Sequence, residues 1–217
     1  MFDPGKSQDA AAALVEAAAH RAFELFRNQA FRAEAALDAL DQVEQDRIFN
    51  ELVTACIVLI MLVLEAPDLR VPAGFWDRLT RLRELVPTAY VDSLKALGVE
   101  DEHLKVWDKL IAMRYEEYAR DRHDVRSAAM HLGSREKPLD LDELSRIRLL
   151  VPVQAVAIGC HHHICRGNTD GRDELFKLTL KALAGFYVDV RLRLEGGKNT
   201  LLTRARRLLR RMMAGER

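Results

Sequence analysis

The sequence lacks an excess of charge of either sign. Lysine plus arginine total 33 in the 217 residues, aspartate plus glutamate also total 33, and the formal net charge is therefore zero. A chain with this balance has no overall electrostatic preference for nucleic acid or for an anionic membrane surface. Any such preference must come from a local concentration of charge.

Cysteine is scarce, and the chain does not open with a leader-like segment. Cys56, Cys160 and Cys165 are an odd number without regular spacing. A chain of this length with 49% hydrophobic residues buries a core without needing disulfides. The first residues also lack the cationic and apolar regions of a signal peptide. We therefore expect a cytoplasmic protein.

Long hydrophobic runs are rare, and the one present is too short to cross a bilayer. Only 13 residues, almost all apolar, separate Glu51 from Glu65, whereas a transmembrane helix takes about 20. We predict no transmembrane segment. We predict instead a buried central helix from about Val43 to Glu65, ended by Pro67 and apolar on all sides because other helices surround it.

Strand patterns, repeats and low-complexity linkers are absent, while helical periodicity dominates. We predict an all-α multi-helix bundle of about seven or eight helices, forming a single helical domain over residues 1–217. Within it we expect a core bundle over 43–165 and a C-terminal helical extension over 171–214. The first 66 residues contain no glycine after Gly5. This argues against a TetR-like repressor, whose N-terminal helix-turn-helix needs a glycine-containing turn.

Caps and breakers set the expected helix ends in the first half of the chain. A first helix is expected to start at the capping residue Ser7 and to run to a break before Asp41. Two short helices are expected over 73–86 and 87–97. Pro87 would occupy the first turn of the second helix, which Gly98 would end.

A longer helix is expected over 101–131, with an apolar stripe at a helical spacing of 3, 4, 4 and 3 residues. The stripe consists of Leu104, Trp107, Ile111, Tyr115 and Tyr118.

Asp140 and Glu143 have capping-box spacing at the start of a helix that reaches about Cys165, in which Pro152 is expected to produce a kink. A helix over 173–194 and a basic last helix, capped by Asn199 or Thr200, complete the predicted elements.

One short pattern offers catalytic chemistry. Arg126 and His131 are separated by four residues near the expected end of the helix over 101–131, and Gly133 and a polar loop follow. An arginine-rich chain holds about one such pair by chance, so the surrounding helix, loop and capped helix carry the argument. Five residues along a straight helix turn the two side chains about 140° apart. We therefore expect the helix to end near Gly133.

This arrangement resembles the R-x(4–6)-H motif of the HEPN superfamily, over roughly residues 43–165. The family consists of all-helical domains, many of them metal-independent ribonucleases of toxin–antitoxin, phage-defence and CRISPR-associated systems. The resemblance implies an endoribonuclease or RNA-binding protein without a cofactor, and a site shared across a homodimer. His131 would act as acid and base, and Arg126 would stabilise charge on the phosphate.

A second cluster, CHHHIC over 160–165, contains metal-ligating residue types. His161 and Cys165 are four residues apart, so they share a helix face and are weak candidates for two zinc ligands. Two ligands do not make a structural zinc site, and we expect no metal. The alternative is that Cys160 and Cys165 are small core residues and that the histidines line a partly exposed helix end.

Basic charge is concentrated at the C-terminus. Residues 199–217 hold six arginines and one glutamate, a net charge of +5, which leaves −5 for residues 1–198. Leucine, alanine and methionine occupy one face of the expected helix, and the other face would bind RNA phosphates or a protein partner. A terminal helix that covers the core is an equally simple interpretation. The residues of the basic face are Arg204, Arg206, Arg207, Arg210 and Arg211.

Two functional hypotheses remain open. The first is a HEPN-like RNA-binding protein or metal-independent endoribonuclease that works as a homodimer through Arg126 and His131. The second is a non-enzymatic helical adaptor, or subunit of a larger nucleoprotein assembly, that docks through its basic C-terminal helix.

Overall fold

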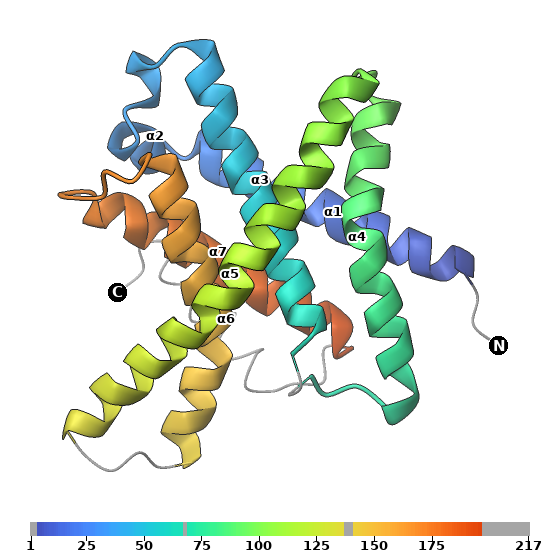
Figure 1. Ribbon diagram of the computed structural model, residues 1–217, viewed down its shortest axis with the longest axis vertical. Coiled ribbons are helices and arrows are strands. Elements are labelled where there is room, and N and C mark those ends of the chain that lie inside the picture. The colour runs from blue at the N-terminus through green and yellow to red at the C-terminus, as the bar shows by residue number, and fades with distance from the viewer. Residues whose placement is uncertain (1–3, 67–68, 137–140, 197–217) are drawn as a thin grey trace.

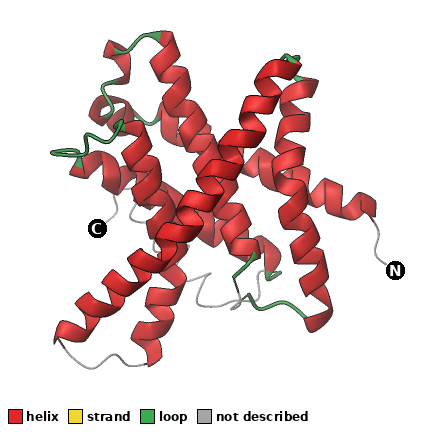
Figure 2. Cartoon of the chain, viewed as in Figure 1, coloured by secondary structure: helices red, strands yellow, loops and turns green. Residues whose placement is uncertain are grey.

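The computed structural model describes residues 4–66, 69–136 and 141–196. Within these ranges the chain forms α-helices, two short 3₁₀ helices and no strand (Figure 2), which confirms the all-α prediction. The elements are α1 (Pro4–Arg27), α2 (Gln29–Glu34), η1 (Leu37–Ala39), α3 (Gln42–Leu64), η2 (Ala73–Phe75), α4 (Trp76–Ala96), α5 (Asp101–Glu136), α6 (Leu141–Ile164) and α7 (Asp173–Leu194).

Helix α3 is the centre of the fold. Asp41 caps it by accepting a hydrogen bond from the backbone N–H of Glu44 at 2.8 Å, and every residue from Glu51 to Leu64 is buried. By length and composition α3 is apolar enough to cross a membrane, but 83% of its most apolar 18-residue window is buried inside the protein. The prediction of a buried central helix is confirmed.

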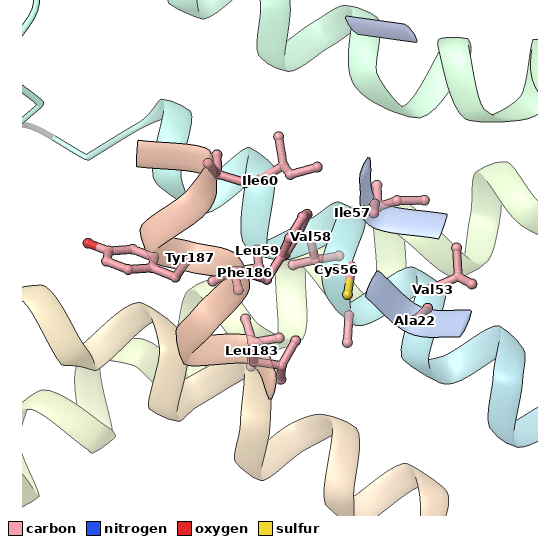
Figure 3. Packing of buried hydrophobic residues seen from close by; sticks show 14 of the residues in the cluster. Ala22, Val53, Cys56, Ile57, Val58, Leu59, Ile60, Leu183, Phe186 and Tyr187 are labelled. Carbon is pink, nitrogen blue, oxygen red and sulfur yellow. The ribbon is translucent and has the colours of Figure 1, made fainter. Parts of the chain in front are cut away.

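Helices from both ends of the chain meet α3 in the core. Figure 3 shows Ala22 of α1 and Leu183 and Phe186 of α7 around the α3 residues Cys56 and Ile57. α3 also contacts α4, α5 and α6. Burying one such aliphatic or aromatic side chain is worth about 1.5 to 3 kcal/mol, so contacts with α3 supply much of the driving force for folding.

Helix α5 crosses α3 and pairs with a different helix at each of its ends (Figure 1). Its first half packs against α4, and its second half packs against α6. The predicted apolar stripe faces the core, because Leu104, Ile111 and Tyr118 are buried and Trp107 and Tyr115 are partly buried against the core cluster.

The start of the chain differs from the prediction. Ser7 lies inside α1 and is buried, so it does not cap the helix. The expected single helix also ends early, at Arg27, because the Asn28 side chain accepts a hydrogen bond from the N–H of Phe31 at 3.0 Å and begins α2. The expected break before Asp41 is confirmed, since Asp41 caps α3.

The two short helices predicted over 73–86 and 87–97 are one helix, α4, with Pro87 inside it. Proline in a helix removes one backbone hydrogen bond and crowds the preceding turn. A stripe of buried residues nevertheless continues on both sides of Pro87, and its burial outweighs that cost. The stripe consists of Leu79, Leu82, Val86 and Tyr90.

Gly98 ends α4 as predicted. Its φ of 86° lies in the left-handed region that favours glycine. The N–H of Gly98 donates to the carbonyl of Lys95 at 3.0 Å, and the N–H of Val99 donates to that of Leu94 at 3.1 Å. This pair of bonds is the Schellman motif.

The last two described helices end where the sequence predicts. α6 ends at Ile164, one residue before Cys165, and includes Pro152; the kink expected at this proline stays a prediction. α7 has the predicted bounds. The capping residue expected at Asp140 and the basic helix expected from Asn199 or Thr200 lie outside the described residues.

Helices α5 and α6 touch most closely where a glycine faces a tyrosine. A Cβ atom added to Gly159 of α6 would lie 2.1 Å from Cε1 of Tyr118, which is fully buried on α5. No real Cβ contact is that short, and the tyrosine ring is held on all sides by the core. Only glycine therefore fits at position 159.

We predict that Gly159→Ala lowers the free energy of unfolding by about 1 to 3 kcal/mol, the usual cost of overpacking a core. Gly185→Ala is the matched control, because Gly185 also lies within a helix but a Cβ there meets nothing within 4 Å. Because alanine has a higher helix propensity than glycine, we expect Gly185→Ala to leave the free energy of unfolding unchanged or to raise it by up to about 1 kcal/mol. Urea denaturation measures the free energy of unfolding of both variants. Equal effects of Gly159→Ala and Gly185→Ala would contradict a close contact between Gly159 and Tyr118.

Candidate functional site

Arg126 and His131 lie in the last third of α5, residues 125–136, which we call its outer part, and both side chains are exposed. The expectation that the helix ends near Gly133 is wrong, because α5 continues through both residues to Glu136. On an unbroken helix the two side chains point about 140° apart. One copy of the chain therefore does not bring them together on one phosphate, and the proposed catalytic role stays a prediction.

The other predicted contact residues lie outside the described part of the chain. Arg204, Arg206, Arg207, Arg210 and Arg211 all belong to the segment 197–217, so their role in binding also stays a prediction.

His161 and Cys165, the weak zinc candidates, occupy different environments. His161 is 7% exposed and packs edge-on against Phe176, with ring centroids 5.5 Å apart. Burial lowers the pKa of His161, and this favours the neutral ring. Cys165 is half-buried against the core cluster. Burial raises the pKa of its thiol, which disfavours the thiolate that binds zinc.

A different group has metal-ligating side chains close together. Among the described residues, Glu100, Glu102 and His103 are the group of three whose ligand atoms all lie within 4.8 Å of one another. They surround the start of α5, and all are exposed. The sequence carries their signal as a Glu-x-x-His spacing. An exposed acidic group at a helix start is also what the helix dipole favours, and we assign no metal to it.

A polar network joins α3, α5 and α6 in the interior. Arg114 of α5 donates from Nε to Glu51 Oε2 at 3.1 Å and from Nη2 to Glu51 Oε1 at 2.7 Å. The side chains of Glu51 and Arg114 are 8% and 13% exposed. Burial opposes the charge on Arg114, but its bonds to Glu51 outweigh that effect and raise the pKa of the guanidinium. Two-point pairing of this kind offsets the cost of burying both charges.

The network extends to α6 through Glu117. Arg114 Nη1 donates to Glu117 at 3.2 Å, and Nε2 of His163 lies 2.8 Å from the same carboxylate. The side chain of His163 is 18% exposed and lies in the last turn of α6, so it is a partly exposed helix-end residue, as the sequence suggested, that also takes part in this network.

Cys160 and Tyr118 line the same interior. Cys160 is fully buried, and its thiol lies 3.9 Å from the backbone oxygen of Glu51. Burial is the main reason that the pKa values of Cys160 and Tyr118 are both raised well above their usual range. Both groups are thus neutral. A neutral, buried thiol is unsuited to nucleophilic work.

A second network is centred on Glu65, which follows the last residue of α3. Its carboxylate binds Arg83 of α4 and the hydroxyl of Tyr115 of α5. Arg122 of α5 lies 3.8 Å away. Burial raises the pKa of the Tyr115 hydroxyl, so this group keeps its proton and donates a hydrogen bond to Glu65. Glu65 therefore ties three helices together.

Arg47 provides a third polar connection, between the start of α3 and the end of α6. Its guanidinium donates to the backbone oxygens of His163 at 2.7 Å and Ile164 at 2.9 Å. These carbonyls belong to the last turn of α6, where no residue of the helix can donate to them, although the carbonyl of His163 also accepts a hydrogen bond from the N–H of Arg166 at 3.2 Å. Arg47 also pairs with Glu44 at 3.1 Å, which fixes the guanidinium in place.

These three networks hold helices together, and sequence patterns did not reveal them. Each binds a side chain of α3, or the residue that follows it, to α4, α5 or α6. A signal was present in the sequence, because Glu51 and Glu65 border a run that is apolar on all sides. Carboxylates at the edges of a surrounded helix need cationic partners. Spacing alone does not identify those partners, which come from residues far away in the chain.

Comparison of the chain with known protein families, with curated proteins and with solved structures finds no match.

Proposed function

We propose that the protein is a non-enzymatic helical subunit of a nucleoprotein assembly, which contacts RNA through its basic C-terminal residues. One observation supports this proposal above the others. The polar side chains that the helices bring together, around Glu51, Glu65 and Arg47, are bonded to other helices. They give a rigid body, and rigidity suits a subunit that positions a binding segment.

The distribution of charge supports contact through the C-terminus. Residues 199–217 carry a net charge of +5, whereas residues 1–198 carry −5. An acidic body repels the phosphate backbone of RNA, and a compact group of arginines attracts it. Contact would therefore be confined to the basic segment, and it would weaken steeply as salt is added.

We predict that the full-length protein binds a short fluorescent single-stranded RNA, with affinity that falls as salt rises. Each phosphate neutralised contributes about −0.7 to the slope of log K against log salt. Five arginines in contact give a slope of roughly −3.5. Replacing Arg204, Arg206, Arg207, Arg210 and Arg211 by glutamine should remove most of the binding and flatten the slope, measured by fluorescence anisotropy.

The control for that experiment changes cations of the body. Lys105, Lys109 and Arg120 are exposed on α5, and glutamine at all three positions should leave the slope unchanged. Equal losses in the two variants would refute contact through the C-terminal residues, as would RNA affinity that does not depend on salt.

A homodimeric endoribonuclease is the second candidate. It is favoured by the exposure of both Arg126 and His131 in the last third of α5. Because one helix directs the two side chains apart, a second copy must supply the missing member of each pair. This hypothesis keeps the roles that the HEPN resemblance implies, with His131 as acid and base and Arg126 as the charge-stabilising group.

The nuclease hypothesis predicts cleavage of labelled mixed-sequence RNA in excess EDTA. Arg126→Ala and His131→Ala should each abolish cleavage, and mixing the two variants should restore part of it through heterodimers with one intact composite site. Circular dichroism confirms that folding is matched. Intact RNA with the wild-type protein, or cleavage that survives both substitutions, would exclude this site for that substrate class.

A further inference from the structure

An open apolar groove of about 330 Å³ lies between α1, α4 and the end of α7. Its floor is made by aliphatic side chains from three separate segments, Leu14 of α1, Leu79 and Leu82 of α4, and Leu194 of α7. Val71, from the connection before η2, also lines the groove. Pockets for small ligands span about 300 to 1,000 Å³, so this groove has the size for a small or medium-length ligand.

Two arginines line the same groove. Arg78 of α4 is half-buried and lies over the ring of Phe75, 5.7 Å from its centroid. Arg193 of α7 is exposed. Within residues 4–66, 69–136 and 141–196, no carboxylate forms an ion pair with either guanidinium. The groove therefore combines an apolar floor with two cations that have no anionic partner there.

A neighbouring hollow between α1 and α7 is lined by an arginine that is already paired with carboxylates. It measures about 450 Å³ and shares Ala13 and Arg193 with the groove. Its other arginine, Arg21, is bound to Asp189 at 3.1 Å and to Glu24 at 3.2 Å. Charges that already neutralise one another attract an ionic ligand weakly, so the apolar groove is the stronger binding site.

Charge decides which occupant suits the groove. Residues 199–217, which lie outside the described part of the chain, carry six arginines and one glutamate, so they offer little negative charge to Arg78 and Arg193. A second copy of the groove would bring the same two cations. An apolar ligand that carries one negative charge satisfies both the floor and the arginines, because guanidinium binds carboxylates through paired hydrogen bonds.

We propose that this groove binds a small amphipathic anion, such as a medium-chain carboxylate. The alkyl chain lies on Leu14, Leu79 and Leu82, and the carboxylate lies between Arg78 and Arg193. The inference is independent of the RNA-binding role, since it uses neither the C-terminal residues nor the outer part of α5.

The first test uses decanoate, below its micelle concentration, in isothermal titration calorimetry with the full-length protein. Wild-type protein should bind decanoate saturably at one site. Ala13→Phe fills the groove from its α1 wall and should weaken binding by at least about tenfold. Ala12→Phe is the matched control, because Ala12 is equally exposed on the same helix and does not line the groove.

The second test separates charge from shape. Replacing Arg78 and Arg193 together by glutamine should weaken decanoate by about tenfold while leaving uncharged decanol nearly unchanged. The proposal is overturned if wild-type protein binds no decanoate, if Ala12→Phe weakens binding as much as Ala13→Phe, or if the arginine changes affect decanol and decanoate equally. RNA affinity, measured in the same variants, should not change.

Discussion

The structure depends on how the two carboxylates at the ends of the apolar stretch of α3 are neutralised. Glu51 is buried, and Glu65 follows the last turn of the helix. A charged carboxylate without a partner in such an environment costs several kcal/mol. Arg114 of α5 is bonded to Glu51, while Glu65 is bonded to Arg83 of α4 and to the neutral hydroxyl of Tyr115 of α5. The crossing of α5 over α3 is therefore fixed by charge as well as by apolar packing.

The bonding of polar side chains between helices also indicates which parts of the protein are available to contact other molecules. Arg114, Glu117, Tyr115 and His163 have residue types common in active sites, yet each is bonded to a neighbouring helix. Side chains held in this way stabilise the bundle. Two features at the surface of the described residues remain for contact with other molecules, the outer part of α5 and the groove between α1, α4 and α7, and the basic C-terminal residues, outside the described part of the chain, are a third candidate. The outer part of α5 and the C-terminal residues concern RNA in our proposals, and the groove concerns a small anion.

Local signals in the sequence predicted the elements that depend on them. The bounds of α7, the buried character of α3 and the glycine end of α4 all followed from nearby residues. Predictions failed where packing overrides a local signal. Pro87 was expected to begin a helix, but buried residues on both sides of it keep α4 continuous. Ser7 was expected to cap a helix that begins earlier. The partners of Glu51 and Glu65 were missed because they lie 63 and 50 residues away.

A double-mutant cycle on Glu51 and Arg114 measures whether this buried ion pair holds α5 against α3. Urea denaturation of Glu51→Gln, Arg114→Met and the double variant gives three changes in the free energy of unfolding. Each single change leaves one buried group without its partner and should cost about 3 kcal/mol or more. The double variant should cost less than the sum of the two by at least about 1.5 kcal/mol. Additive losses, or single losses below about 1 kcal/mol, would show that this pair does not hold α5 against α3.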